Sequence, residues 1–351
     1  MRSAVAFVET SPGTLAVAEG DLRRLASPPD GVGAFYAPDF RLADPAPWRV
    51  PTSEARATLP LRAFLEEFSR RGPAGSLPEW TAPDEPRFVR AYRSLAASFA
   101  RGDLLKGVPV TRACAAWPDD EAEPLFRRLL SRIGSLPEGL HPYGLLGPAR
   151  DGAGSEFIVG ATPEILFDRR GRGTIRSEAI AGTRVVGSAA PPLLSDPRIR
   201  EEHGRVVHDL VERMSLWGPP EATAPRPCAF GTLEHLVSVV GIETAGGPAF
   251  DEIARHLHPT AALGSYPRGA AGSRWLEEID PLGERGSFGA PFGFRYPDGT
   301  GRCLVAIRGI RYLGGRLEIW AGCGVVPSSR YDDEWREACD KIRAVRSLWG
   351  I

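Results

Sequence analysis

Apolar residues recur at helical spacing in three stretches of the chain. The stretch FVRAYRSLAASFAR (88–101) places its aromatic and leucine side chains on one face, and Gly102 follows where the helix is expected to stop. The stretches 195–214 and 330–349 have the same periodicity, and Ser195 stands where a helix cap is expected. We therefore predict three amphipathic helices, each with one buried face.

Shorter apolar stretches separated by turn residues predict strands. SEFIVGATPEILF and TIRSEAIAGTRVVG flank the turn DRRGRG, CLVAIRGIRYL and RLEIWAGCGVV flank Gly314 and Gly315, and GDLLKGVPVTRACAAW is expected to be a strand that carries Lys106. Strand pairs and helices without regular alternation indicate an α+β fold with antiparallel sheets. We distinguish residues 1–87, which are rich in Pro, Ala and Arg, from residues 88–351, and expect both parts to form one structural domain.

The charge balance excludes some classes of partner. The 351 residues include 43 Lys and Arg and 44 Asp and Glu, a net charge of −1, so no long-range field would hold nucleic acid or an anionic membrane. Five scattered cysteines argue against a disulfide framework or a structural zinc site and fit a reducing cytoplasm. The N-terminal apolar run is too short for a signal peptide, and no run approaches membrane-spanning length. We expect a soluble cytoplasmic protein.

Lysine occurs only twice, at Lys106 and Lys341, among 43 basic residues. Arginine keeps its proton at any pH at which proteins work, whereas a lysine in a dry environment can lose it and act as a base. Lys106 lies in an otherwise apolar segment, which suits that role. A stray lysine in an arginine-biased sequence is the simpler alternative.

Glu164 follows Pro163 inside an apolar stretch. A buried carboxyl group there would have a raised pKa, in the range useful for a general acid. The alternative is a glutamate on an edge strand that points into water, because most glutamates are exposed.

Three charged residues share one face of the last predicted helix, namely Glu334, Glu337 and Lys341. An exposed ion pair is the ordinary explanation of the spacing between Glu337 and Lys341. Glu202 lies near the edge of the apolar face of the preceding predicted helix. Two glutamates from different helices are suitable oxygen ligands for one hard cation, if the fold brings them together.

Arg308 is expected in the middle of a strand, on the same face as apolar neighbours. An arginine in such a place requires a planar anion, either a ligand carboxylate or a buried Asp or Glu. The sequences AIAGTR (179–184) and AGCGVV (321–326) end strands with small residues, where a backbone can approach a ligand or simply turn.

Taken together and in this order, several stretches resemble the chorismate-utilising enzymes, which include isochorismate synthase, salicylate synthase and the large subunits of anthranilate and aminodeoxychorismate synthases. The similar segments are GDLLKGVPVTR, GATPEILF, SEAIAGTR, REEHGRVVHDLV, LHPTAALGSYPRGAA, ERGSFGAPFGF, LVAIRGI and AGCGVVPSSRYDDEWREACDK. They extend over about residues 88–350, and the N-terminal part is only weakly similar. The resemblance implies a large domain of two packed antiparallel sheets with helices outside.

The resemblance also implies chemical roles. Lys106 corresponds to the base that activates water for attack at C2 of chorismate, where the ammonia-using synthases have Gln. Glu164 corresponds to the general acid that protonates the departing C4 hydroxyl. Glu202 and Glu337 correspond to Mg²⁺ ligands, with Glu334 helping through water.

Further positions correspond to the substrate pocket. Arg308, Gly322 and Gly324 match the pocket for the enolpyruvyl carboxylate. Gly182 and Thr183 match the loop that contacts the ring carboxylate. Lys341 matches a lysine of the pocket, and His258 matches a histidine near the leaving oxygen, with a histidine satisfied within the core as its alternative.

Three departures from the family pattern concern the reaction rather than the fold. Phe288 stands where the family commonly has Tyr, the spacing from Lys106 to Arg112 is longer than usual, and Arg198 and Ile199 replace a Lys and acidic pair. We expect an isochorismate synthase of menaquinone or siderophore biosynthesis, acting as a monomer without a glutaminase subunit. Salicylate synthase, an ammonia-using synthase subunit and a degenerate chorismate-binding protein are the alternatives.

Overall fold

The computed structural model describes residues 4–52, 56–69, 77–149, 154–171, 173–189, 191–244 and 246–351. It confirms the predicted α+β class, because two large antiparallel sheets dominate it. The first sheet has eight strands in the order β6-β2-β1-β9-β10-β19-β20-β8. Their bounds are β6 Arg56–Pro60, β2 Thr14–Gly20, β1 Ala4–Ser11, β9 His141–Pro148, β10 Ser155–Thr162, β19 Gly309–Leu313, β20 Arg316–Gly322 and β8 Val110–Ala116.

The second sheet has ten strands in the order β13-β15-β12-β11-β18-β17-β4-β5-β3, with β14 paired to β15. Their bounds are β13 Glu221–Ala222, β15 Leu233–Glu243, β12 Thr174–Val185, β11 Ile165–Arg170, β18 Gly301–Val305, β17 Pro291–Arg295, β4 Ala34–Tyr36, β5 Trp48–Pro51, β3 Leu22–Leu25 and β14 Arg226–Phe230. The short strands β7 (Lys106–Gly107) and β16 (Ser265–Tyr266) form a separate pair. The segment that carries Lys106 is therefore two strands rather than the one predicted, because the chain leaves β7 before it begins β8.

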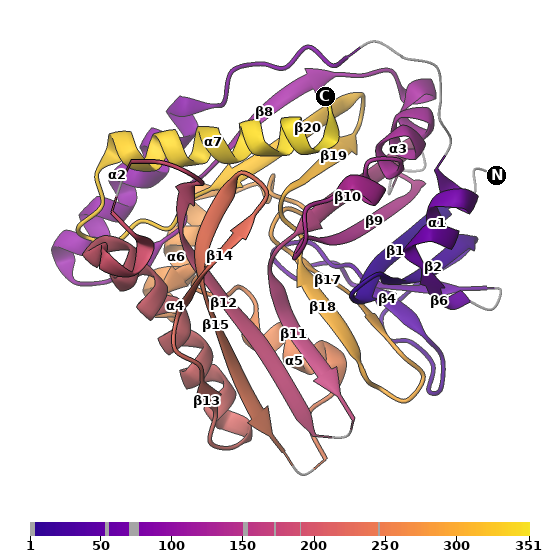
Figure 1. Cartoon of the computed structure of the whole chain (residues 1–351), viewed down its shortest axis with the longest axis horizontal. Helices are drawn as coiled ribbons and strands as arrows, with labels where there is room; N and C mark the ends of the chain where they lie inside the picture. Colours follow the sequence, from indigo (N-terminus) through magenta and orange to yellow (C-terminus); the bar gives the residue numbers. More distant parts are fainter. Residues whose placement is uncertain are drawn as a thin grey trace.

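Helices cover the outer face of each sheet (Figure 1). Their bounds are α1 Leu61–Phe68, α2 Glu85–Arg101, α3 Ala122–Leu130, α4 Pro197–Met214, α5 Phe250–Leu257, α6 Ala270–Ile279 and α7 Tyr331–Trp349. One core lies between the first sheet and α1, α3 and α7, another between the second sheet and α4 and α5, and a third between the two sheets. The molecule is thus layered as helices, sheet, sheet and helices.

The three predicted helices are confirmed as α2, α4 and α7. Gly102 ends α2 in the left-handed conformation, with φ of 75°. The predicted cap of α4 was wrong by one position, because Asp196 rather than Ser195 accepts the N–H groups of Arg198 and Ile199. Either residue type suits the position, so the sequence does not distinguish them.

Two apolar stretches that were predicted as single strands each cross from one sheet to the other. The first leaves β10 at Thr162 and enters β11 at Ile165, and the second leaves β18 at Val305 and enters β19 at Gly309. The two crossovers lie side by side, because β10 pairs with β19 and β11 pairs with β18. Backbone hydrogen bonds join them, from Ala161 N to Arg308 O and from Val305 N to Glu164 O.

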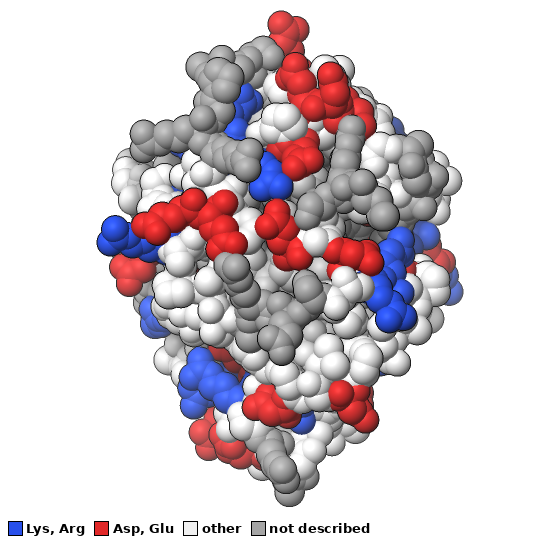
Figure 2. Space-filling model, turned by 90° about the vertical axis from the view of Figure 1, so that its right-hand side faces the viewer, with Lys and Arg blue, Asp and Glu red and all other residues white. Residues whose placement is uncertain are grey.

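The first 60 residues contribute to both sheets. Strands β1 and β2 extend the first sheet beyond β9, and β4 and β5 extend the second beyond β17. On the face shown in Figure 2, acidic and basic side chains are interspersed over the described surface, as the net charge of −1 suggests. None of the helices in the described part of the chain carries an apolar stretch of the length needed to cross a lipid bilayer.

Candidate active site

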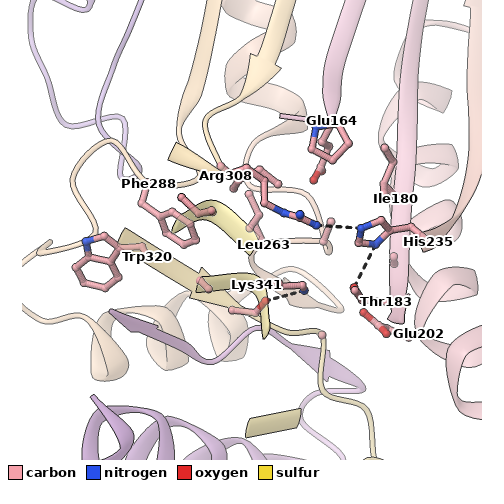
Figure 3. A pocket seen from close by; sticks show the side chains of 18 residues that line it. Glu164, Ile180, Thr183, Glu202, His235, Leu263, Phe288, Arg308, Trp320 and Lys341 are labelled. Atoms are coloured by element: carbon pink, nitrogen blue, oxygen red, sulfur yellow. Dashed lines mark hydrogen bonds between the residues drawn. The ribbon is translucent and has the colours of Figure 1, made fainter. Parts of the chain in front are cut away.

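A pocket lies where the two crossovers meet the N-terminal part of α4 and the middle of α7 (Figure 3). Glu164 and Arg308 come from the crossovers, Glu202 from α4 and Lys341 from α7. Thr183, Gly322 and Gly324 also line the pocket, with an apolar wall that includes Phe288 and Trp320. The structure thus brings together residues that are as far as 177 positions apart (164 to 341) in the sequence.

Lys106 is fully buried and does not itself line this pocket, but it lies next to two residues that do, Glu202 and Gly324. Its Nζ donates a 2.6 Å hydrogen bond to the carbonyl oxygen of Ala261 and lies 3.9 Å from Glu202 Oε1. Burial lowers the pKa of Lys106, and the nearby carboxylate of Glu202 opposes this shift. A Cβ atom added to Gly324 would lie 2.6 Å from the Lys106 Nζ, so this amine stands directly behind a pocket-lining glycine.

Glu164 is also buried, and its Oε1 has no hydrogen-bond partner among the described residues. Burial raises the pKa of Glu164 to about 8, although Lys106 acts in the opposite direction. The carboxyl group is therefore protonated at neutral pH and able to donate a proton into the pocket. The edge-strand alternative does not apply, because the side chain is not exposed.

Arg308 was expected in mid-strand, and this was wrong, because it lies in the crossover between β18 and β19 with φ of 57°. The apolar pattern continues through the crossover, so periodicity alone does not reveal the break. Its guanidinium is buried, and its Nη2 lies 3.0 Å from the Nε2 of His235. Neither Asp nor Glu forms an ion pair with Arg308 in the described part of the structure. The guanidinium is thus available to an anion in the pocket.

His235 was not identified from the sequence, although it lines the pocket. It lies on β15 opposite Thr183 of β12, and its Nδ1 is 3.1 Å from the Thr183 Oγ1 (Figure 3). Burial, helped by the charge of Arg308, lowers the pKa of His235 well below its usual range, so the ring is neutral. The strand pairing with Thr183 is the signal that would have identified it, but β15 was not predicted.

Lys341 has a different environment from Lys106. Its Nζ lies 2.8 Å from the Glu337 Oε1 and donates a 2.8 Å hydrogen bond to the Gly322 carbonyl. Although burial alone would lower the pKa of Lys341, the Glu337 carboxylate outweighs it and the pKa is raised. Lys341 therefore remains a cation beside the pocket.

Glu202, Glu334 and Glu337 lie close enough to influence one another electrostatically. Burial and then the charge of Glu337 raise the pKa of Glu334 to about 8. Burial likewise raises the pKa of Glu202, with Lys106 acting in the opposite direction. The Oε2 atoms of Glu202 and Glu334 are buried without a hydrogen-bond partner among the described residues.

These carboxylates suit a hard divalent cation, because each like-charge contact would become favourable with a cation between the groups. In the described residues, no three such side chains are already arranged as a metal centre. Glu334 is paired with Arg198 at 2.8 Å and Glu337 with Lys341, so cation binding would require their side chains to exchange partners. The donor set fits Mg²⁺, with Glu202, Glu334 and Glu337 as the residues to hold it.

The glycines near the pocket are required by close contacts. A Cβ atom on Gly324 would lie 2.0 Å from the Glu202 Oε1. Gly182 has φ of 73° at a bulge in β12, and a Cβ atom there would lie 2.4 Å from a methyl group of Ile199. Gly182 thus allows α4 to pack closely, while Thr183 beside it lines the pocket.

His258 is not among the pocket-lining residues. Its Nε2 lies 2.7 Å from the carbonyl oxygen of Phe40, and its ring packs edge-on against the ring of Phe40. Burial lowers the pKa of His258 to about 3. This environment is that of the core-histidine alternative, so we no longer include His258 among the residues that face the pocket.

Comparison with known proteins gives one family match. Residues 149–350 match the family model described as chorismate binding enzyme. This range contains the crossovers, α4, β15 and α7, and therefore every pocket-lining residue, whereas Lys106 lies outside it.

Curated relatives differ in the activity that their names give. The chain is 31% identical over 204 residues to a salicylate biosynthesis isochorismate synthase of Pseudomonas aeruginosa. The aligned region covers 55% of this chain and 42% of the relative. The chain is 29% identical over 325 residues to an anthranilate synthase component 1 of Thermus thermophilus. This aligned region covers 86% of this chain and 65% of the relative. The chain thus spans less than two thirds of the length of either relative.

The fold is similar to that of a solved structure, the menaquinone-specific isochorismate synthase MenF from Escherichia coli. The TM-score is 0.75 at 20% sequence identity, over 99% of this chain and 89% of the MenF chain. The similarity confirms the predicted arrangement of two large antiparallel sheets.

Proposed function

The chain belongs to the family of chorismate binding enzymes, and from this premise we propose that it is an Mg²⁺-dependent isochorismate synthase. The proposal depends on one observation above all. A buried carboxyl group with a raised pKa lines the pocket, beside an arginine that has no carboxylate partner among the described residues, and a buried lysine with a lowered pKa lies directly behind the pocket-lining Gly324. These are the base, the acid and the anion-binding group that the exchange of a ring hydroxyl for water requires.

Chorismate is a dianion, and the pocket offers cationic groups to its carboxylates. We assign the enolpyruvyl carboxylate to Arg308 and the backbone of Gly322 and Gly324. His235 supports this assignment, because it holds the guanidinium on one side and the Thr183 hydroxyl on the other. The ring carboxylate is then assigned to the side of Thr183, Glu202 and Lys341.

In the proposed reaction, the neutral amine of Lys106 accepts a proton from a water molecule. At the same time the oxygen atom of that water forms a bond to C2 of the chorismate ring. The ring double bonds shift, the C4–O bond breaks, and Glu164 protonates the departing hydroxyl as water. One water enters and one leaves, while Lys106 ends protonated and Glu164 ionised. A proton passed from the lysine to the carboxylate restores both groups.

Glu202, Glu334 and Glu337 are the proposed Mg²⁺ ligands, with Glu334 acting through water. When bound, the cation would supply Lewis-acid stabilisation of negative charge on the ring carboxylate. Glu202 and Glu334 are buried, so these side chains would hold the cation apart from bulk solvent.

The lysine argues for water as nucleophile, and we therefore propose that no ammonia-supplying glutaminase subunit takes part. The test is to incubate the protein with chorismate and Mg²⁺ and to identify the product by mass and fluorescence. Isochorismate is expected. Salicylate with pyruvate would replace the proposal by salicylate synthase, an aminated product with ammonium would indicate a synthase subunit, and unchanged chorismate would contradict an enzymatic function.

A further inference from the structure

Asp209 is a buried carboxylate on α4 to which the proposed function assigns no role. It is only 1% exposed, and it follows Glu202 by seven positions on the same helix. Seven residues make almost two full turns of an α-helix, so the two carboxylates lie on one face of α4. Glu202 lines the pocket, whereas Asp209 is not among the described residues that do so. Asp209 therefore belongs to the structure behind the pocket.

Three N–H groups donate hydrogen bonds to the Asp209 carboxylate. Two belong to the guanidinium of Arg268, whose Nε donates to Oδ1 at 3.0 Å and whose Nη2 donates to Oδ2 at 3.1 Å. The third is the backbone N–H of Ala261, which donates to Oδ2 at 2.9 Å. The guanidinium of Arg213, one turn further along α4, lies 3.9 Å from Oδ1. Asp209 is thus a paired buried charge that also holds one backbone group of another segment.

Ala261 belongs to the segment between α5 and β16, which forms part of the pocket wall. The next two residues, Ala262 and Leu263, line the pocket. Further along the segment, the hydroxyl of Tyr266 lies 2.7 Å from the Nδ1 of His208 on α4. Helix α4 therefore holds this segment at two points, at the Ala261 N–H and at the Tyr266 side chain.

The carbonyl group of the same Ala261 is the hydrogen-bond acceptor of Lys106, whose Nζ lies 2.6 Å from it. This carbonyl shares a planar peptide unit with the N–H of Ala262, which donates to the Thr260 hydroxyl at 3.3 Å. Asp209 holds the N–H on one side of Ala261, and Thr260 holds the peptide unit on the other side. These contacts keep the carbonyl in one orientation.

A fixed carbonyl restricts the direction in which the Lys106 amine can accept a proton. A lysine amine that has lost a proton keeps two of its three N–H donors and gains one lone pair. When one N–H points to the Ala261 carbonyl, fewer directions remain for the lone pair. Glu202, whose Oε1 lies 3.9 Å from the amine, is on the same face of α4 as Asp209. This helix therefore positions both the carboxylate beside the amine and the carbonyl that accepts from it.

We propose that Asp209 is a positioning residue of the proposed reaction, because it fixes Ala261 against α4 and the Ala261 carbonyl in turn orients the amine of Lys106. The inference rests on the proposed function for its catalytic meaning, but the contacts that carry it do not depend on that function.

The test uses two double variants that differ only in the acceptor for the Ala261 N–H. Asp209→Asn with Arg268→Met keeps a side-chain oxygen, whereas Asp209→Leu with Arg268→Met has a side chain of similar size without one. Both variants remove the ion pair as a whole, so neither leaves one of its members buried and unpaired. The single variants Asp209→Asn and Asp209→Leu repeat the comparison with Arg268 retained. Glu212→Gln, which alters an exposed carboxylate of the same helix, is the control.

The first measurement needs no chorismate. The chain has only two lysines, so protein labelled with ¹⁵N at the lysine Nζ gives two amine signals, which Lys341→Arg assigns. At one fixed pH, we expect the Lys106 signal to shift in the variant with Asp209→Leu and to keep its position in the variant with Asp209→Asn. The Lys341 signal should keep its position in both variants. An unchanged Lys106 signal with Asp209→Leu would overturn the proposal, whether or not the protein converts chorismate.

The kinetics of chorismate turnover test the catalytic meaning. We expect kcat with Asp209→Leu to be about 10- to 100-fold lower than with Asp209→Asn, a loss typical of a residue that orients a functional side chain. KM should change by less than about threefold, because the groups assigned to the substrate carboxylates are unaltered. Equal kcat in the two double variants would reduce Asp209 to a structural role. Absence of any turnover in the unaltered protein would contradict the proposed function, and the lysine signals would still decide whether Asp209 orients the amine.

Discussion

The two lysines of the chain have opposite surroundings, although Lys341 lines the pocket and Lys106 lies directly behind its wall at Gly324. Lys106 has a backbone carbonyl as its hydrogen-bond acceptor, its nearest carboxylate oxygen is 3.9 Å away, and its pKa is lowered by burial. Lys341 has a carboxylate oxygen at 2.8 Å, and its pKa is raised. Burial acts in the same direction on both, so the distance to the nearest carboxylate decides the difference. Burial without a close carboxylate thus favours the neutral amine at Lys106, whereas the close carboxylate of Glu337 favours the charged amine at Lys341.

Substitution of Lys106 is expected to have the largest effect on turnover. We expect Lys106→Gln and Lys106→Arg to lower kcat for chorismate by about 1,000-fold or more, because neither side chain can accept a proton from water at neutral pH. Steady-state kinetics measure the effect, and circular dichroism verifies folding. Comparable turnover in either variant would remove Lys106 from the proposed mechanism.

Loss of the Glu337 carboxylate, which lies beside Lys341, should weaken Mg²⁺ binding. We expect Glu337→Gln to weaken Mg²⁺ binding by about 10- to 100-fold, because a neutral amide replaces an anionic ligand. Isothermal titration calorimetry and the Mg²⁺ dependence of turnover measure it, with the exposed Asp333→Asn on the same helix as control. Equal Mg²⁺ affinity in Glu337→Gln and the control would contradict the ligand role.

Exchange of Lys341 should have a smaller effect than exchange of Lys106. A permanent cation suffices at this position, so Lys341→Arg should keep most of the activity, whereas Lys341→Met should raise KM by about tenfold through loss of one charge contact. Comparing these variants with Lys106→Arg tests whether the two lysines have different roles. Equal sensitivity of both lysines to arginine would show that the distinction is wrong.

The acid near Lys106 provides a prediction about stability. Burial raises the pKa of Glu164 in the folded protein to about 8, well above its ordinary value of 4.5. In this interval the folded state binds more protons than the unfolded state, so the contribution of Glu164 is present at low pH and is lost as pH rises from 4.5 through 8. Glu164→Gln should therefore gain about 4 kcal/mol relative to the unaltered protein between pH 5 and pH 9, as measured by urea unfolding. A constant difference over this range would contradict the raised pKa.

The sequence predicted the helices better than the connections. Helical periodicity in α2, α4 and α7 depends on local spacing, and the buried faces follow from it. The sheet crossovers at Glu164 and Arg308 were missed because both sheets bury apolar residues on the intervening face, so the pattern does not change where the chain changes sheet. Long-range pairing, rather than local preference, determines these breaks.

In the candidate site too, residues recognisable from local sequence were identified, and residues placed by long-range pairing were not. Conspicuous residues such as Lys106 and Glu164 were identified by their unusual setting and by family resemblance; Glu164 lines the pocket and Lys106 is buried behind its wall. His235 was missed because its position follows only from the pairing of β12 with β15. His258 was placed in the pocket by resemblance, whereas its contact with Phe40 is made by a segment more than 200 residues earlier in the chain.

The paired crossovers have a mechanical consequence. Two continuous chain segments, hydrogen-bonded to each other, tie the sheets together at the point where the acid and the guanidinium lie. The two sheets therefore cannot move apart at this point unless these hydrogen bonds break. We expect any widening of the pocket to come from the remaining wall, formed by α4, α7 and the segment at Gly324, with the separation of Glu164 and Arg308 unchanged.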